Sequence, residues 1–322
     1  MRFAFTDDQQ LFAEGLRDLL AKECTPAHVR AAWEEGTGHD AALWSRLGEM
    51  GVLGVLVPEE QGGFGGTDVD LVLLLEELGK AAAPGPIVEH SAVVAPALIG
   101  TDFATGLADG SVIATAALDG SPYVPHAQVA DIVLVPGGVA RTEGATLTDV
   151  EGIDQGRRIF TVDGMTVAPV AFDSDLAFDR GALATAAFLV GLSERMIEVA
   201  AEYARQREQY GKPIGAYQAV KHLLADALQK VEFAKPAVYR AAWSISVDEP
   251  TRARDVSMAK AFASDAAYRA SRSAMQVHGA IGYTWEADLQ LWMKKAWALQ
   301  RAWGDATFHR RRVADAVLGL SR

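Results

Sequence analysis

The second half of the chain carries apolar stripes at helical spacing, and this pattern constrains the fold more than any other feature. In the first stripe, apolar residues from Leu183 to Ala204 recur three and four positions apart, with acidic residues such as Glu194 on the other side. Such spacing gives a helix one apolar face. The predicted long helices begin after Phe178, at about Val220, near Thr251 and after Tyr283, the last one continuing to the C-terminus. Four such helices with short connections predict an antiparallel four-helix bundle over residues 176–322.

The first hundred residues also favour helices, but shorter ones. Apolar stripes follow Thr6 and Asp7, either of which can cap a helix, and a further stripe begins at Asp68. Residues 52–58 form an extended apolar run, and residues 62–66 are a glycine-rich connection that lacks the spacing of a phosphate-binding loop. We expect an N-terminal helical domain over residues 1–108.

Between the two helical regions, residues 109–175 favour strands. Short β-favouring runs alternate there with turn residues. The pair Asp163-Gly164 separates two such runs and predicts a β-hairpin, because both central residues of the favoured tight turn have positive φ. The expected fold class is therefore α+β, mostly α: an N-terminal helical domain, a small middle β domain and a C-terminal antiparallel four-helix bundle.

Composition excludes several classes of function. The 42 acidic residues outnumber the 30 lysines and arginines, and the net charge of -12 argues against binding nucleic acid or an anionic membrane. Cys24 is the only cysteine, which excludes an intrachain disulfide and a thiolate metal cluster. The His, Asp and Glu residues show no metal-ligand spacing. Neither a signal peptide nor a membrane-spanning apolar run is present, so we expect a cytoplasmic protein without a membrane partner.

Two segments at predicted helix ends combine planar polar side chains with glycines. They are residues 207–218 and residues 276–283. The guanidinium of Arg207 matches the geometry of phosphate oxygens, and Gly279 allows a flat ligand to approach the backbone. Each residue alone also has a structural explanation, since arginines interact favourably with helix C-termini and glycines end helices. Together they favour a site for the phosphates and adenine of a dinucleotide.

Several motifs resemble the acyl-CoA dehydrogenase family over essentially the whole chain. In the first half they are residues 47–54, 57–65 and 76–79. In the second half, the signatures of the family's C-terminal bundle are matched by Arg207-Glu-Gln-Tyr-Gly-Lys-Pro-Ile, Met258-Ala-Lys-Ala-Phe-Ala-Ser-Asp and Gln276-Val-His-Gly-Ala-Ile-Gly-Tyr. The resemblance implies an FAD-dependent enzyme that desaturates an acyl-CoA thioester.

The resemblance also assigns five residues to the cofactor. The matching positions in the family hold the pyrophosphate and adenine end of an FAD that is lodged mainly in the neighbouring subunit. In this chain they are Arg207, Tyr210, Gln218, Gln276 and Gly279. The resemblance further implies oligomerisation through the bundle and a middle domain that is a shortened β-barrel.

Three departures from the family pattern concern catalysis. The family's flavin- and substrate-binding loop is absent, and residues 114–121 take its place. The two usual positions of the catalytic glutamate hold Trp303 and Gly181. A positioned general base contributes about 10²–10⁴-fold to a rate, and neither tryptophan nor glycine can act as one. Asp305, two residues past Trp303, is the fallback carboxylate.

We therefore expect the shorter, base-less subunit of a heteromeric acyl-CoA dehydrogenase, similar to the short members of the α2β2 enzymes that actinobacteria use on steroid side-chain thioesters. A longer acyl-CoA dehydrogenase subunit would supply the base and the isoalloxazine pocket, and an electron-transfer flavoprotein is the implied electron acceptor. Two alternatives stay open. One is a self-sufficient homo-oligomeric acyl-CoA dehydrogenase that uses Asp305, and the other is a flavin-free structural or regulatory homologue.

Overall fold

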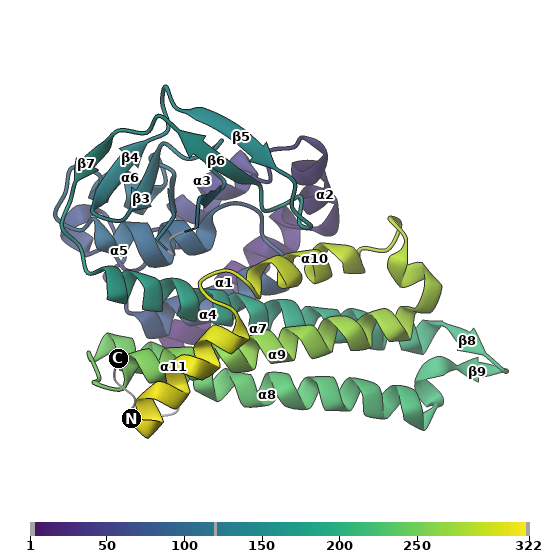
Figure 1. Ribbon diagram of the computed structural model, residues 1–322. Helices are drawn as coiled ribbons and strands as arrows, with labels where there is room; N and C mark the ends of the chain where they lie inside the picture. The colour runs from purple at the N-terminus through teal and green to yellow at the C-terminus, as the bar shows by residue number, and fades with distance from the viewer. Residues whose placement is uncertain (1–3, 119–120, 320–322) are drawn as a thin grey trace.

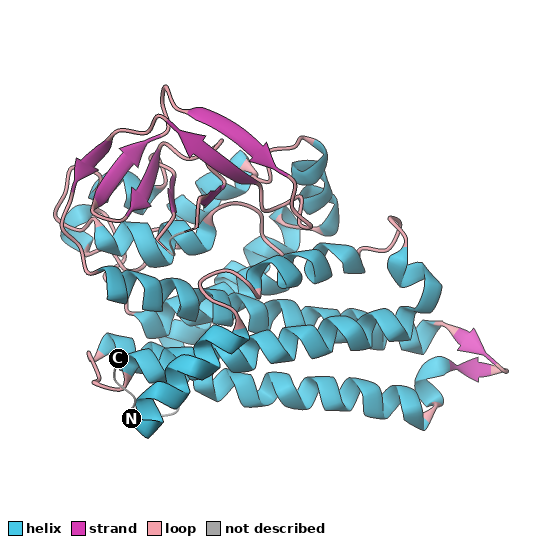
Figure 2. Ribbon diagram, viewed as in Figure 1, coloured by secondary structure: helices cyan, strands magenta, loops and turns pink. Residues whose placement is uncertain are grey.

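The computed structural model describes residues 4–118 and 121–319, and most of them are helical (Figure 2). Thr6 caps the first helix as expected: its hydroxyl accepts a hydrogen bond from the backbone N–H of Gln9. The N-terminal elements are α1 (Asp7–Glu23), α2 (Pro26–Glu34), α3 (Ala41–Glu49), the 3₁₀ turn η1 (Glu59–Gln61), α4 (Asp68–Lys80), the π-helix η2 (Val88–Val94), α5 (Ala95–Ala97) and α6 (Ala104–Asp109).

The apolar run over residues 52–58 is not extended, as we had expected, but forms a series of buried turns. Gly54 explains the difference, because a Cβ at that position would lie 2.7 Å from the Cα of Ala108. The segment thus packs directly on α6, and among the described residues it pairs with no strand. Burial on every side, rather than membership of a sheet, accounts for its continuous apolar sequence.

The middle region forms two small sheets that share an apolar core (Figure 1). One sheet has the order β1-β3-β4-β7 and the other the order β2-β6-β5. The strands are β1 (Ala114–Ala116), β2 (Tyr123–Pro125), β3 (Ile132–Val135), β4 (Gly138–Arg141), β5 (Thr146–Val150), β6 (Ile159–Asp163) and β7 (Val167–Pro169). Residues 119–120, part of the segment expected to replace the family's flavin- and substrate-binding loop, lie outside the described residues.

The hairpin predicted at Asp163-Gly164 is wrong. Gly164 has a φ of +82°, but Asp163 is not in the left-handed region, so the expected tight turn cannot form. The chain crosses here from one sheet to the other. β6 pairs with β2 and β5, whereas β7 pairs with β4.

The C-terminal region is a bundle whose first three helices run antiparallel (Figure 1). The helices are α7 (Ser174–Gln206), α8 (Gln218–Ser246), α9 (Arg252–His278), α10 (Leu289–Leu299) and α11 (Ala306–Leu318). By length and composition α7 could cross a membrane, but 83% of its most apolar window is buried inside the fold. It is therefore the core helix of the molecule. It packs against α4, α8 and α9.

Close contact between α4 and α7 depends on two glycines. A Cβ at Gly191 would lie 1.9 Å from the carbonyl oxygen of Glu76, and a Cβ at Gly79 would lie 2.3 Å from that of Phe188. Such distances leave no room for any side chain. The two backbones are thus in direct contact, which ties the N-terminal region to the bundle.

The fourth predicted helix does not continue to the C-terminus; it is interrupted between α10 and α11. Trp303 and Gly304 have φ values of +56° and +87°, which no helix accommodates. Hydrogen bonds from α9 stabilise this loop. The fully buried Lys260 donates to the carbonyl oxygens of Gln300 and Gly304, each 3.1 Å away. On the other side, His309 Nε2 lies 2.8 Å from the carbonyl oxygen of Trp303.

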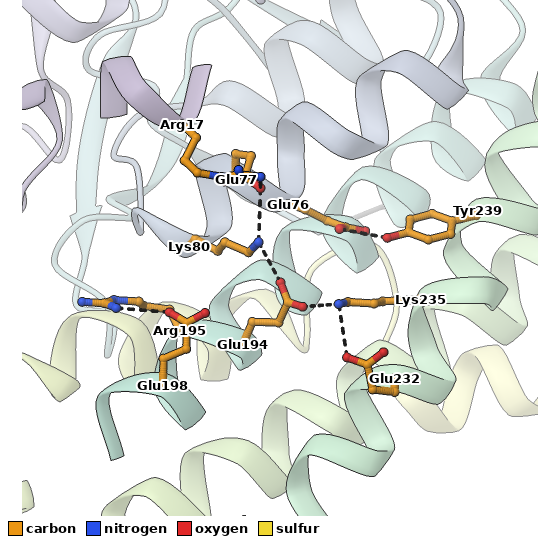
Figure 3. A network of polar contacts seen from close by, with 10 residues as sticks. All are labelled: Arg17, Glu76, Glu77, Lys80, Glu194, Arg195, Glu198, Glu232, Lys235 and Tyr239. Atoms are coloured by element: carbon orange, nitrogen blue, oxygen red, sulfur yellow. Dashed lines mark hydrogen bonds and ion pairs between the residues drawn. The ribbon is translucent and has the colours of Figure 1, made fainter. Parts of the chain in front are cut away.

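A network of charged side chains joins α1, α4, α7 and α8 (Figure 3). Glu77 accepts two hydrogen bonds from Arg17 and pairs with Lys80, whose ammonium group lies 3.1 Å from Glu194. Glu194 continues the network to Lys235 on α8. Beside this network lies Glu76, which accepts a hydrogen bond from Tyr239 at 3.1 Å. Burial, and secondly the charge of Glu194, raise the pKa of Glu76 to about 8, so this carboxyl is protonated at neutral pH.

We predict that Glu76→Gln removes a pH dependence of stability. The pKa of Glu76 is about 8 in the folded state, above its ordinary value of 4.5, so the native state binds a proton that the unfolded state releases. Stability from this group is complete below the ordinary pKa and falls as pH rises toward 8, by about 1.4 kcal/mol for each pKa unit of difference. Glutamine stays neutral throughout. Urea unfolding at several pH values should show a shallower loss for the variant.

The matched control is Glu198→Gln, because Glu198 belongs to the same region but its side chain is half exposed. This control should follow the wild type at every pH. If Glu76→Gln and wild type lost stability in parallel between about pH 5 and pH 8, the native protein would not hold the proton assigned to Glu76.

Candidate functional site

The five residues assigned to FAD by resemblance lie at one end of the bundle. There α7 and α9 end and α8 begins, so three chain segments meet (Figure 1). We call this set the bundle-end cluster; its members are Arg207, Tyr210, Gln218, Gln276 and Gly279.

A short hairpin at this end carries two members of the cluster. Strands β8 (Glu208–Gln209) and β9 (Lys212–Pro213) pair on either side of Tyr210 and Gly211, whose φ values are +53° and +80°. Two positive φ values in succession are the signature of the tight hairpin turn. The turn leaves the side chain of Tyr210 91% exposed. The cation of Lys212 lies 4.3 Å from the centre of the Tyr217 ring and braces the hairpin.

The bundle-end cluster has open hydrogen-bonding groups, which fits a role in holding phosphates and adenine. The side chains of Arg207, Gln218 and Gln276 are exposed, and none of them bonds to another residue in the described ranges 4–118 and 121–319. Gly279 has a φ of +64° and an empty space of at least 4 Å where a Cβ would stand. A guanidinium, two amides and an accessible backbone therefore face outward together. Within residues 4–118 and 121–319, none of the five lines one of the main pockets, so a ligand held by them would gain from a second surface.

His278, within the second motif, does not belong to this set. Its ring is buried, its Nδ1 lies 2.8 Å from the carbonyl oxygen of Ala274, and it stacks on Tyr203 with ring centres 4.5 Å apart. These contacts explain the histidine as a structural residue at the end of α9.

The two usual base positions contact each other. A Cβ at Gly181 would lie 2.4 Å from the indole of Trp303, and this indole is only 5% exposed. The ring therefore fills the space into which a side chain at position 181 would extend. Neither position offers a proton acceptor.

The fallback carboxylate, Asp305, faces away from these positions. It is exposed and caps α11, accepting a hydrogen bond of 2.8 Å from the backbone N–H of Phe308. This backbone hydrogen bond lowers the pKa of Asp305 below its ordinary value, which weakens it as a base. Its neighbours include Asp265 and Tyr268, which with it line a shallow depression that Trp303 does not reach.

A cavity of about 530 Å³ lies beside Trp303, between the β strands and the end of α10. Two carboxylates that sequence analysis did not single out line it. Glu89 Oε1 lies 2.7 Å from Arg157 Nη2, and Asp154 Oδ2 lies 3.7 Å from Lys295 Nζ. Each carboxylate already balances a buried cation, so protonating it would leave that cation uncompensated in the interior. Neither carboxylate is therefore a free base. In the sequence, only Glu89 could have been noticed, as an acidic residue within a largely apolar segment.

The bundle-end cluster and the two usual base positions lie far apart along α7. Gly181 and Arg207 are separated by 26 residues along α7 and its C-cap, a distance of about 39 Å at ~1.5 Å per helical residue. Groups that could hold a metal ion do not occur among the described residues.

Comparison with known proteins gives relatives over the whole chain. Models of the acyl-CoA dehydrogenase N-terminal and C-terminal domains match residues 6–102 and 174–318. Acyl-CoA dehydrogenase IpdE2 of Mycobacterium tuberculosis is 34% identical over 297 residues, covering 90% of this chain and 91% of the relative. The IpdE2 protein of Mycolicibacterium smegmatis is 34% identical over 317 residues, covering 97% and 99%.

Solved structures agree with these relatives. A chain of the ChsE4-ChsE5 complex from Mycobacterium tuberculosis superimposes with a TM-score of 0.87 at 25% identity, covering all of both chains. A chain of a Tcur3481-Tcur3483 steroid ACAD variant has the same fold, with a TM-score of 0.88 at 24% identity over 97% of this chain and 98% of that chain. With family models matching both of its helical regions and relatives 34% identical over nearly its full length, the chain belongs to the acyl-CoA dehydrogenase family of oxidoreductases.

Proposed function

We propose that the chain is the non-catalytic subunit of an FAD-dependent acyl-CoA dehydrogenase with α2β2 composition. One observation carries this proposal: the bundle-end cluster lies about 39 Å along α7 from base positions that hold Gly181 and Trp303. The chain thus offers groups for the far end of a cofactor but no base near its own cavity. A longer acyl-CoA dehydrogenase subunit supplies the base and the isoalloxazine pocket. When bound, FAD accepts the hydride in the α,β-desaturation of the acyl-CoA substrate.

In this proposal each member of the bundle-end cluster binds rather than reacts. Arg207 donates to the pyrophosphate, because its planar guanidinium matches phosphate oxygens and has no competing partner in the described chain. The amides of Gln218 and Gln276 serve the adenine and ribose edge. Gly279 lets the backbone approach the ligand, and the hairpin carries Tyr210 outward toward the neighbouring subunit.

Two further observations support a heteromeric assembly, and a third supports a steroid substrate. The ChsE4-ChsE5 relative is a complex of two chains, and the other solved relative is described as a steroid enzyme. Large apolar side chains are exposed on α8, α9 and α11, among them Phe233, Phe262 and Phe308. Exposed apolar surface of this kind favours association through the bundle. We further propose that the complex acts in the cytoplasm on a steroid-derived acyl-CoA, as the description of one solved relative suggests. An electron-transfer flavoprotein is the proposed electron acceptor, since a structure described as such a protein also has this fold.

The first test of the proposal compares flavin binding by the chain alone with flavin binding by the complex. Purified alone, the chain should show no visible flavin absorbance, and co-purified with a longer acyl-CoA dehydrogenase subunit it should carry FAD. Arg207→Ala in the complex should weaken FAD binding by roughly 10- to 150-fold, the loss of one charged hydrogen bond of about 1.5–3 kcal/mol. The readout is FAD retained after gel filtration.

Arg205→Ala is the matched control, because Arg205 is an exposed arginine on the last turn of the same helix. Retention of FAD by this control and its loss from Arg207→Ala would tie the effect to one guanidinium. Stoichiometric FAD and desaturation by the chain alone would overturn the proposal. FAD content unaffected by Arg207→Ala would favour the flavin-free alternative.

The second test removes the fallback base without disturbing the fold. Asn caps a helix about as well as Asp, so Asp305→Asn keeps the start of α11 while removing the carboxylate. Turnover of the complex should stay within about twofold of wild type. A general base at this position would instead give a loss of about 10²–10⁴-fold in kcat, and that outcome would make Asp305 the base, as the self-sufficient alternative requires.

A further inference from the structure

The loop between α10 and α11 is a strained segment. Trp303 stands in the left-handed region with a φ of +56°, which is unfavourable for a bulky residue. A residue in such a conformation keeps it only while its surroundings hold it there. The indole is 5% exposed and packs against Gly181. Its position therefore depends on the contacts that hold the loop.

The strongest of these contacts come from one buried side chain on α9. Lys260 Nζ donates to three oxygen atoms: the carbonyl oxygens of Gln300 and Gly304, each 3.1 Å away, and the hydroxyl oxygen of Ser264 at 3.3 Å. An ammonium group has three N–H donors, so the three oxygens match it in number. The arrangement thus fits the protonated form of Lys260.

Loss of this proton would weaken the hold on the loop. A neutral amine has two N–H groups and a lone pair, so one of the three oxygens would lose its donor and face the lone pair. A buried oxygen without a donor is unfavourable. Lys260 is fully buried, and this burial lowers its pKa to about 7, so both of its forms are present at neutral pH.

A second contact holds the loop without depending on pH in this range. His309 Nε2 lies 2.8 Å from the carbonyl oxygen of Trp303, and His309 Nδ1 lies 3.1 Å from the hydroxyl oxygen of Ser257. Burial lowers the pKa of His309 to about 4, so the ring is neutral above pH 5 and donates one hydrogen bond. This contact stays in place while Lys260 titrates.

The other charged groups near Lys260 do not titrate at neutral pH. Asp305, at the start of α11, opposes the effect of burial and raises the pKa of Lys260. Arg301 in the loop is exposed to solvent. The remaining charged groups on the elements packed against α9 form ion pairs, which are Asp179 of α7 with Arg252 and Arg312, Asp255 with Arg240 of α8, Asp154 with Lys295 of α10, and Asp265 with Arg310 of α11.

We propose that Lys260 is a proton-dependent latch on the loop between α10 and α11. The ammonium form holds the carbonyl groups on both sides of Trp303 and so keeps the indole against Gly181. When the proton leaves, the strained segment relaxes around the carbonyl group that His309 still holds, and the indole leaves Gly181. The loop is therefore closed under mildly acidic conditions and open under mildly alkaline ones. This inference concerns the chain itself and does not rest on the proposed function.

Fluorine NMR of the full chain labelled with 5-fluorotryptophan tests this inference. The chain has seven tryptophans, and the resonance of Trp303 is identified by its disappearance in Trp303→Phe. In the wild type this resonance should shift with pH, with a midpoint at about 7. Lys260→Met keeps an unbranched side chain but has no N–H donor. Its Trp303 resonance should stay at the high-pH position of the wild type at every pH.

Lys294→Met is the matched control. Lys294 on α10 is another lysine whose pKa is lowered by burial, but its ammonium group lies over the rings of Trp33 and Trp285. This variant should leave the titration of Trp303 unchanged, whereas loss of the titration would show that Lys260 is not the group responsible.

Asp305→Asn decides the question if Lys260→Met does not fold. Asparagine keeps the cap of α11 but removes the charge that raises the pKa of Lys260, so the midpoint of the Trp303 titration should move to lower pH. An unchanged or higher midpoint would overturn the inference. So would a wild-type Trp303 resonance that is independent of pH, or a titration that persists in Lys260→Met. None of these results bears on flavin retention in the complex.

Discussion

The direct backbone contact of α7 with its neighbours is the constraint on which the rest of the structure depends. At Gly191 the helix touches the backbone of α4, and at Gly181 it touches the indole of Trp303. Both contacts exclude any side chain, so α7 is fixed at two points along its length. A continuous 33-residue helix held in this way cannot bring its two ends together. The separation between the base positions and the bundle-end cluster is therefore built into the fold, and no loop movement within this chain removes it.

The absence of a base in this chain is supported by the packing around it. A glutamate at position 181 would meet the indole of Trp303, and a glutamate at position 303 would replace a ring that is 5% exposed by a carboxylate in the same buried place. The loop also needs positive φ at Trp303 and three hydrogen bonds, two from Lys260 and one from His309. Restoring a base would thus require several coordinated changes, whereas binding the far end of a cofactor requires only exposed groups.

Sequence patterns predicted the helices well where a single local interaction, such as burial of one face or a helix cap, determines the conformation. The helical stripes gave α7, α8 and α9 because burial of one face determines a long helix, and the cap at Thr6 formed as expected. Predictions failed where distant contacts decide the conformation. The turn at Gly164 connects two sheets, the run at 52–58 is shaped by its contact with Ala108, and the last helix is broken at Trp303 by hydrogen bonds from α9. Motif resemblance located the bundle-end cluster, but not the charges around the cavity, since Glu89, Asp154 and Arg157 come from separate segments that only the fold brings together.

The buried charges explain why a cavity persists beside an indole instead of closing. An apolar void of this size would tend to be filled by rearranged side chains. Here Glu89 and Arg157 pair on one wall, and the backbone of Gly156 together with Lys295 holds Asp154 on another. Closing the space would press these charged groups against apolar rings, which is costly. Polar groups that must find partners thus keep the cavity open, and they also determine which molecules can enter it. The described part of the chain therefore combines a cavity whose carboxylates are already paired with cations and an exposed cluster whose polar groups have no partner within the chain.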